Sequence, residues 1–315
     1  MTSFVEYQNE LSRINEAACA QPEAFVARTE AAYHQSIRSL AESIVRLKRG
    51  CDLVMLSGPS SSGKTTTANL LQYAFRSIDV DSEIISLDDF YRGESQAPLL
   101  ANGQHDYEAP DALNIPEIQE CLSSLMMNHQ CDMPIFNFKV RMPYTYRRKV
   151  VLKERSVAIV EGIHALNPAL IAKLPESRIV KVYISVKQGI YEQSKQLFTA
   201  NEVRLLRRIV RDYNFRGIKP ERTLQMWPVV IDGEKKHIKP FRVNADYTIN
   251  SFHAYEICVL CNQAIPLLKT VSHDSEAFAA ADRLLDCLEK FVVLPAELVP
   301  KNSILREFIG GGIYS

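Results

Sequence analysis

The segment 58–65 reads GPSSSGKT, follows the apolar run Leu53–Leu56 and precedes a helix-compatible run, Thr66–Phe75. A strand, a loop of the pattern G-x-x-x-x-G-K-[ST] and a helix, in this order, form a phosphate-binding loop. Its glycines let the backbone curl so that N–H groups point at phosphate oxygens, and the helix adds its positive N-terminal end. The segment therefore predicts a nucleoside-triphosphate site formed by Gly58, Pro59, Ser60, Ser61, Ser62, Gly63, Lys64, Thr65 and Thr66.

The overall composition argues against polyanionic and membrane partners. Lys plus Arg and Asp plus Glu both number 37, so nothing global favours nucleic acid or an anionic membrane. The N-terminus, MTSFVEYQNELSR, does not resemble a signal peptide, and no apolar stretch approaches the roughly 20 residues that span a bilayer. The seven cysteines are scattered, and Cys258 and Cys261 fall on one apolar helical face, which favours core packing over a metal site. We expect a cytoplasmic enzyme.

From Leu53 onward, short apolar runs alternate with helix-compatible segments. This alternation predicts an α/β fold, a P-loop NTPase-type parallel sheet with helices on both faces, which binds ligands at the carboxyl ends of its strands. Ahead of it, residues 4–49 are expected to form two helices broken near Pro22, the second covering Glu23–Lys48 and stopping at Gly50. This N-terminal segment could pack on the main domain or mediate assembly into a homo-oligomer. The expected strands are Leu53–Leu56, Glu83–Leu87, Val157–Val160, Val180–Val186 and Tyr247–Ile249.

Carboxylates follow two of the expected strands. Asp88 comes just after the second strand, where it can accept a proton from an attacking hydroxyl or hold Mg²⁺ through water; Asp89 is the second candidate. A helix N-cap is the alternative role for this pair. Glu161 ends the third strand in the position of a Walker-B carboxylate directed at Mg²⁺, and a cap on the next helix is the weaker alternative. The predicted metal ligands are thus Thr65, Glu161 and Asp88, while Lys64 serves the β- and γ-phosphates.

Positive charge is densest in the segment 204–217, RLLRRIVRDYNFRG. Its first four arginines recur at three- and four-residue steps, which predicts one basic helical side. Arginines on a lid can neutralise the charge that spreads over a moving phosphoryl group. A nucleic-acid-binding helix and a solvated face are the alternatives, and the neutral overall charge favours the lid. The arginines concerned are Arg204, Arg207, Arg208 and Arg211.

Together these segments resemble the uridine kinase/phosphoribulokinase family of P-loop kinases. The shared motifs are GPSSSGKTT, ISLDDFY, YEAPDAL (107–113), PIFNF (134–138), VEGIHALNP (160–168) and RLLRRIVRDYNFRG. The likeness runs from about Leu53 to Leu268. It is closest to a bacterial branch labelled uridine or nucleoside kinase, which often carries a TGS-type domain in front; no such domain is evident here. The resemblance implies that ATP or GTP, with Mg²⁺, donates its γ-phosphoryl group to an alcohol.

The resemblance also implies roles for individual residues. Asp88 takes the position of the catalytic base, together with Lys64, Arg208 and Arg211 as catalytic residues. Tyr91, Tyr107 and Glu108 fall where the family holds a nucleoside, Arg216 falls in the lid and substrate site, and Phe136, Phe138 and Arg141 would line the acceptor. Uridine kinases typically have Asp at the position of Glu108, and Tyr and His at the positions of Phe136 and Arg141. A Phe cannot hydrogen-bond a base, and an Arg offers only donors; Ile218 stands where a second lid arginine is expected.

We therefore expect a kinase for a small-molecule alcohol, with a nucleoside as the named acceptor. A sugar or polyol acceptor is the first alternative, and a nucleotide-sensing or RNA-associated protein without acceptor chemistry is the second. The expected domains are an N-terminal helical segment (1–50), a P-loop kinase domain (51–270) and a C-terminal helix and tail packed on it (271–315). Within the kinase domain, residues 92–150 would cover the acceptor and residues 200–220 would form the lid.

Overall fold

A computed structural model describes residues 9–47, 50–100, 103, 105–153 and 155–314. Its centre is a parallel sheet with the strand order β11-β8-β1-β7-β2. All five expected strands are confirmed, each to within one residue at either end. They are β1 (Leu53–Ser57), β2 (Ser82–Ser86), β7 (Val157–Glu161), β8 (Ile179–Ser185) and β11 (Tyr247–Asn250).

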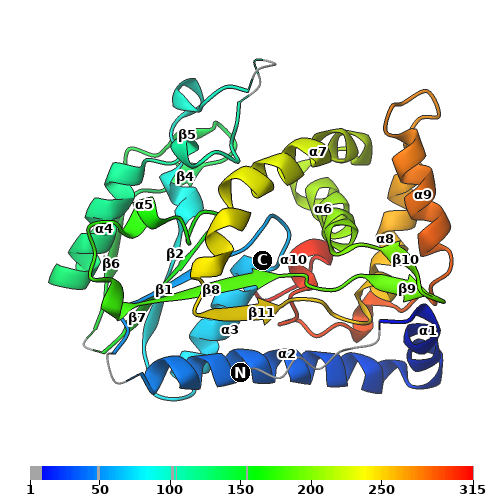
Figure 1. The fold of residues 1–315 in the computed structure, drawn as a ribbon, viewed down its shortest axis with the longest axis horizontal. Coiled ribbons are helices and arrows are strands. Elements are labelled where there is room, and N and C mark those ends of the chain that lie inside the picture. Colours follow the sequence, from blue (N-terminus) through cyan, green and yellow to red (C-terminus); the bar gives the residue numbers. More distant parts are fainter. Residues whose placement is uncertain (1–8, 48–49, 101–102, 104, 154, 315) are drawn as a thin grey trace.

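Both faces of this sheet are covered, as the near-continuous apolar runs predict. In β1, alternate residues point to opposite faces, and all five are buried. Val54 and Leu56 pack in a core with α3 (Lys64–Arg76), whereas Leu53 and Met55 pack in a second core with α4 (Ile115–Asn128). Figure 1 shows α3 and α4 on different sides of the sheet. The fold class expected from the sequence is confirmed.

The strand register brings the carboxyl ends of three strands together. Leu56 of β1 and Ser86 of β2 both pair with Glu161 of β7. The segments that follow these strands therefore begin side by side at one edge of the sheet. These are the glycine-rich loop, the Asp88 segment and the turn at Gly162.

Two helices precede the sheet, α1 (Leu11–Ala20) and α2 (Pro22–Val45), and the expected break at Pro22 is confirmed. In Figure 1, α2 runs along the lower edge of the molecule, and it packs against α3. The helix ends at Val45, so the expected stop at Gly50 is wrong, and Lys48 lies outside the described residues. Ile44 is the last fully buried residue of α2, and Leu47, just past the end of the helix, still packs on the core but is only partly buried.

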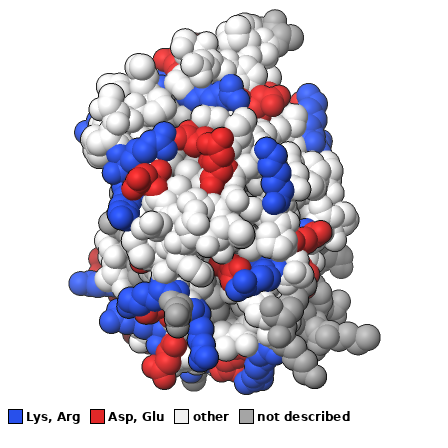
Figure 2. Space-filling view, turned by 90° about the vertical axis from the view of Figure 1, so that its left-hand side faces the viewer, with Lys and Arg blue, Asp and Glu red and all other residues white. Residues whose placement is uncertain are grey.

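Residues 92–150 are more regular than their composition suggests. They contain the 14-residue helix α4 and two antiparallel strand pairs, β3 with β6 and β4 with β5. On the side of the molecule where α4 lies, basic and acidic side chains are interspersed (Figure 2). The strands are β3 (Gln130–Met133), β4 (Phe136–Asn137), β5 (Met142–Pro143) and β6 (Arg148–Val151).

The second half of the chain is mostly helical. Cys258 and Cys261 are buried on α8, which confirms the core-packing interpretation, and the described cysteines form no disulfide. No helix in the described part of the chain is both long and apolar enough to cross a membrane. The elements are α5 (Pro168–Ile171), β9 (Ile190–Glu192), β10 (Lys195–Phe198), α6 (Ala200–Arg216), α7 (Pro220–His237), α8 (Glu256–Leu268), α9 (Phe278–Leu288) and α10 (Arg306–Ile309).

The C-terminal tail reads as polar and turn-rich, but three of its residues are deeply buried. Ile304, Leu305 and Phe308 are each fully buried. They anchor α10 against α6, and Ile304 and Leu305 belong to the same core as the apolar residues of α3. Ile304 also packs against Gly63, so the tail lies next to the glycine-rich loop.

Candidate phosphate and acceptor site

The glycine-rich loop has the backbone that a phosphate cradle requires. Gly63 precedes α3 with φ +87°, a left-handed conformation that favours glycine. At Gly58, a Cβ atom would lie 2.2 Å from the carbonyl oxygen of Ile184, so only glycine allows this approach of β1's loop to β8. The side chain of Lys64 folds back to donate to the carbonyl of Pro59 at 3.1 Å. The N–H groups at the start of α3 thus face the region where phosphates are expected.

Two buried arginines of α6 donate hydrogen bonds to carbonyl groups of this loop. Arg204 Nε donates to the carbonyl of Ser60 at 3.0 Å, and Arg207 Nη1 donates to that of Ser61 at 3.3 Å. Both arginine side chains are buried and paired with buried glutamates, Arg204 with Glu234 and Arg207 with Glu256, each at 2.6 Å. Arg204 and Arg207 therefore support the backbone of the loop, a role that the spacing of the arginines did not indicate. Steps of three and four residues place the four arginines on one side of α6, and burial divides them: Arg204 and Arg207 are buried, whereas Arg208 and Arg211 are only partly buried.

Three other arginines gather around Asp212, which is itself buried. Its carboxylate lies 3.2 Å from Arg208 Nε, 2.8 Å from Arg211 Nη2 and 3.7 Å from Arg216 Nε. Arg208 Nη1 also donates to Ser60 Oγ at 3.0 Å, so this arginine contacts a side chain of the loop. Asp212 therefore holds the side chains of Arg208, Arg211 and Arg216 in place beside the proposed phosphate site.

The carboxylates after β2 and β7 meet at the sheet edge. Ser86 Oγ donates to Glu161 Oε1 at 2.9 Å and accepts from the N–H of Asp88, so Ser86 rather than Asp88 caps the short 3-10 helix 87–90. Burial raises the pKa of Asp88, while the charges of Lys64, Arg216 and Arg211 oppose that shift. Burial and repulsion by Asp88 raise the pKa of Glu161 to about 7.

Asp89, the second candidate base, has a structural role in this arrangement. Its Oδ1 accepts a hydrogen bond from the N–H of Phe136 at 3.2 Å. This contact ties β4 of the insertion to the segment that carries Asp88. Of the two adjacent aspartates, Asp88 is the one within electrostatic reach of Lys64.

Aromatic rings line the insertion beside Asp88. Tyr91 lies 5.8 Å from Phe136 and 6.0 Å from Tyr107 between ring centroids, and Phe136 lies 5.1 Å from Phe138. Burial raises the pKa of Glu108, opposed mainly by the charges of Arg208 and Lys64, which places this carboxylate near the loop. Arg141 is exposed and forms an ion pair with Glu94. The structure therefore gathers the four aromatic residues, and it engages Arg141 with an acidic partner.

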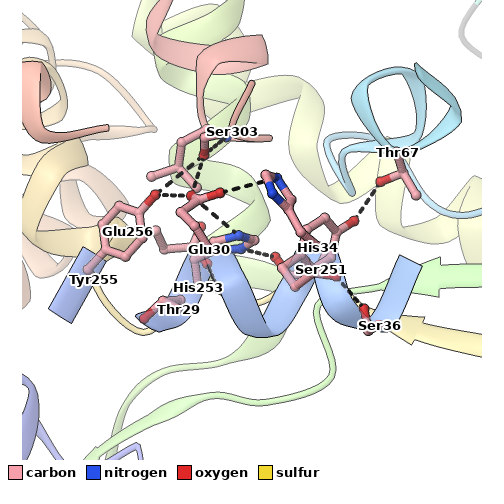
Figure 3. Close-up of polar contacts among 12 residues, drawn as sticks. Thr29, Glu30, His34, Ser36, Thr67, Ser251, His253, Tyr255, Glu256 and Ser303 are labelled. Carbon is pink, nitrogen blue, oxygen red and sulfur yellow. Dashed lines mark hydrogen bonds and ion pairs between the residues drawn. The ribbon is translucent and has the colours of Figure 1, made fainter. Parts of the chain in front are cut away.

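A buried polar network that joins α2 to the tail was not predicted from the sequence (Figure 3). Glu30 of α2 accepts hydrogen bonds from Tyr255 and from Ser303 of the tail, and His253 lies 3.6 Å from the same carboxylate oxygen. Nearby, Tyr33 Oη and Thr67 Oγ1 are 2.6 Å apart, and Thr67 Oγ1 donates to the carbonyl of Gly63 at 2.6 Å. The signal in the sequence was a glutamate within the apolar stripe of a helix, since a charge there needs buried partners.

The chain is similar to known proteins over its central region. The profile of the phosphoribulokinase/uridine kinase family matches residues 53–257. Uridine kinase of Clostridium novyi is 28% identical over 199 residues, which cover 62% of this chain and 86% of that protein. Uridine kinase of Halalkalibacterium halodurans is 27% identical over 199 residues, 62% of this chain and 84% of that protein. A solved structure from Bacillus stearothermophilus, described as a possible uridine kinase, is 17% identical with a TM-score of 0.46, covering 68% of this chain and 96% of that one.

Proposed function

Because the chain belongs to the phosphoribulokinase/uridine kinase family, we propose that it transfers the γ-phosphoryl group of ATP or GTP to a hydroxyl of a nucleoside. Kinases of this kind act mainly by positioning and by stabilising charge. The observation that carries the proposal is the position of Asp88. It stands at the carboxyl end of β2 among Lys64, Arg211 and Arg216 and beside the aromatic insertion.

The surroundings of Asp88 suit a general base. A base must be ionised to accept the proton of the attacking hydroxyl. Burial disfavours the ionised form of Asp88, and the three cations oppose that effect. Lys64 and Arg208, which contacts the loop at Ser60, would neutralise the charge that develops on the phosphoryl oxygens.

Magnesium fits the oxygen donors at this edge. Glu161 and Asp88 lie close enough that repulsion by Asp88 helps to raise the pKa of Glu161, and a cation between them would relieve that repulsion. The exposed hydroxyl of Thr65 stands at the start of α3. These three residues would hold Mg²⁺, whose preference is for oxygen ligands. When bound, the ion would supply positive charge to the β- and γ-phosphates.

The acceptor site favours a molecule with a flat face and hydroxyl groups. Tyr91, Tyr107, Phe136 and Phe138 offer rings for stacking. Glu108 Oε2 is buried without a hydrogen-bond partner among the described residues, so a ribose hydroxyl could donate to it. A nucleoside provides both features.

A sugar or polyol is the second candidate acceptor. Phe136 offers no hydrogen bond to a base edge, and the guanidinium of Arg141 is engaged by Glu94. A non-aromatic acceptor would need the hydroxyl contacts of Glu108 but no base recognition. RNA binding has less support, since Arg204 and Arg207 are buried and charges are interspersed on the face in Figure 2.

An acceptor panel tests the proposal. The chain is incubated with ATP and, separately, uridine, cytidine, ribose, fructose or glycerol, and ADP release is measured. We expect a nucleoside to support turnover, and Asp88→Asn to lower kcat by about 100- to 10,000-fold with little change in ATP binding. Asp282→Asn, the same charge change on exposed α9, is the matched control. Turnover with a polyol but no nucleoside would favour the second candidate, and full activity of Asp88→Asn would remove that residue from the base role.

A further inference from the structure

The C-terminal tail inserts a carboxylate into the start of the helix that follows the phosphate loop. Glu307 Oε2 accepts a hydrogen bond from the backbone N–H of Thr66 at 3.2 Å and from Thr66 Oγ1 at 3.0 Å. Thr66 is the third residue of α3, so its N–H has no partner within the helix. In a phosphate-binding loop, such N–H groups are the ones that receive phosphate oxygens.

The tail is held in this position by its neighbours rather than by Glu307. Ile304, Leu305 and Phe308 are fully buried, and Ile304 lies so close to Gly63 that a Cβ atom there would be 3.3 Å from its side chain. Ser303 is tied to Glu30 of α2 at 2.6 Å. The side chain of Glu307 itself is only partly buried, so it can rotate away while the segment stays in place.

Glu307 also lies within electrostatic reach of the residues that would serve the triphosphate. Burial lowers the pKa of Lys64, and the charges of Glu161, Asp88 and Glu307 oppose that shift. A carboxylate at this place therefore does two things that a phosphate would do. It accepts hydrogen bonds from the start of α3, and it puts negative charge at the positive end of the helix.

We propose that Glu307 is an internal competitor for the phosphate site, and that a nucleotide displaces its carboxylate from Thr66 when it binds. The inference rests on the proposed function only in that the loop binds a nucleoside triphosphate. The residue lies outside the segment 53–257 that matches the family profile, so the competitor belongs to the tail of this chain. Its effect is to weaken the binding of phosphorylated ligands without touching the nucleoside part.

Calorimetric titration of Glu307→Gln tests this idea in the 315-residue chain, without acceptor. Glutamine keeps the size and an acceptor oxygen but removes the charge, and a neutral hydrogen bond is about half as strong as a charge-assisted one. We expect ATP and ADP to bind about fivefold more tightly than to the wild type. Adenosine, which has no phosphate, should bind with unchanged affinity. Glu307→Ala should tighten the binding of ATP and ADP further than Glu307→Gln does.

Glu297→Gln is the matched control, because it removes one negative charge from an exposed position of the same tail. It should leave all three affinities unchanged. Unchanged or weaker ATP binding in both Glu307 variants, with folding verified by urea denaturation, would overturn the proposal. The outcome is independent of acceptor phosphorylation. If ATP binding tightens but no alcohol is phosphorylated, the competitor proposal stands and the kinase proposal fails. If an alcohol is phosphorylated but ATP binding does not tighten, the kinase proposal stands and the competitor proposal fails.

Discussion

The buried pair of Arg207 and Glu256 allows a sharp test of how the phosphate loop is held. Both side chains are fully buried, with Arg207 Nε 2.6 Å and Nη2 2.9 Å from the two carboxylate oxygens. Nη2 also donates to the carbonyl of Ser251 at 2.7 Å, and Nη1 reaches that of Ser61. Glu256→Gln would leave the guanidinium charge buried without compensation.

Removing one partner of a buried ion pair costs about 3–5 kcal/mol. Since the free energy of unfolding of a single domain is about 5–15 kcal/mol, Glu256→Gln should remove a large part of it. With a urea m-value of about 3 kcal/mol/M, the unfolding midpoint should fall by between about 1 and 2 M. Asp232→Asn, which breaks an exposed ion pair with Lys236, should leave the midpoint unchanged.

The double variant Arg207→Met/Glu256→Met separates folding from function. Replacing both charges by apolar side chains should restore much of the free energy of unfolding, because no charge is then buried alone. The carbonyl of Ser61 still loses its donor, so ATP affinity should remain below that of the wild type although the chain is folded. A loss of less than about 1 kcal/mol in Glu256→Gln would show that the buried pair adds little to stability, and normal ATP binding by the double variant would show that the carbonyl of Ser61 does not need this donor.

Two further predictions follow from buried groups near the site. Burial lowers the pKa of His164 from 6.5 to about 4. Between these pH values the unfolded chain binds more protons than the folded chain. The free energy of unfolding should therefore fall as the pH falls, by up to about 3 kcal/mol. Urea denaturation at pH 4.5 and 7 should show a smaller pH effect in His164→Gln than in the wild type, and equal effects would contradict this assignment. Gly58→Ala would place a Cβ atom 2.2 Å from the carbonyl oxygen of Ile184, so we expect loss of ATP binding in calorimetry, and retained wild-type affinity would show that the loop can shift.

The sheet and its acidic edge were predictable because their signals are local. A buried parallel strand reads as an unbroken apolar run, and β1 and β7 are such runs. Ligands gather at the carboxyl ends of parallel strands, so Asp88 and Glu161 could be placed at the same edge from their position after each run. Neither step required knowledge of residues distant in the sequence.

The roles of the arginines were not predictable, because they depend on partners that lie far along the chain. Arg204 pairs with Glu234 and Arg207 with Glu256, 30 and 49 residues away. A helical wheel shows that the arginines recur, but it cannot show which of them meet a buried carboxylate. The tail is similar, since Ile304, Leu305 and Phe308 stand among polar residues and are buried through contacts with segments far away in the sequence, such as Gly63 and α6.

The segments that flank the matched family region bear directly on the phosphate loop. Tyr33 of α2 contacts Thr67, which donates to the carbonyl of Gly63, and Ile304 of the tail packs against Gly63 from another direction. Glu30 joins these two segments through Ser303. Because the backbone at Gly63 sets where the N–H groups of α3 point, a shift of α2 or of the tail would move the phosphate cradle itself. Glu30, Tyr33 and Ile304 therefore support the proposed nucleotide site, and substitutions of these residues should change ATP affinity even though they lie outside the matched family region.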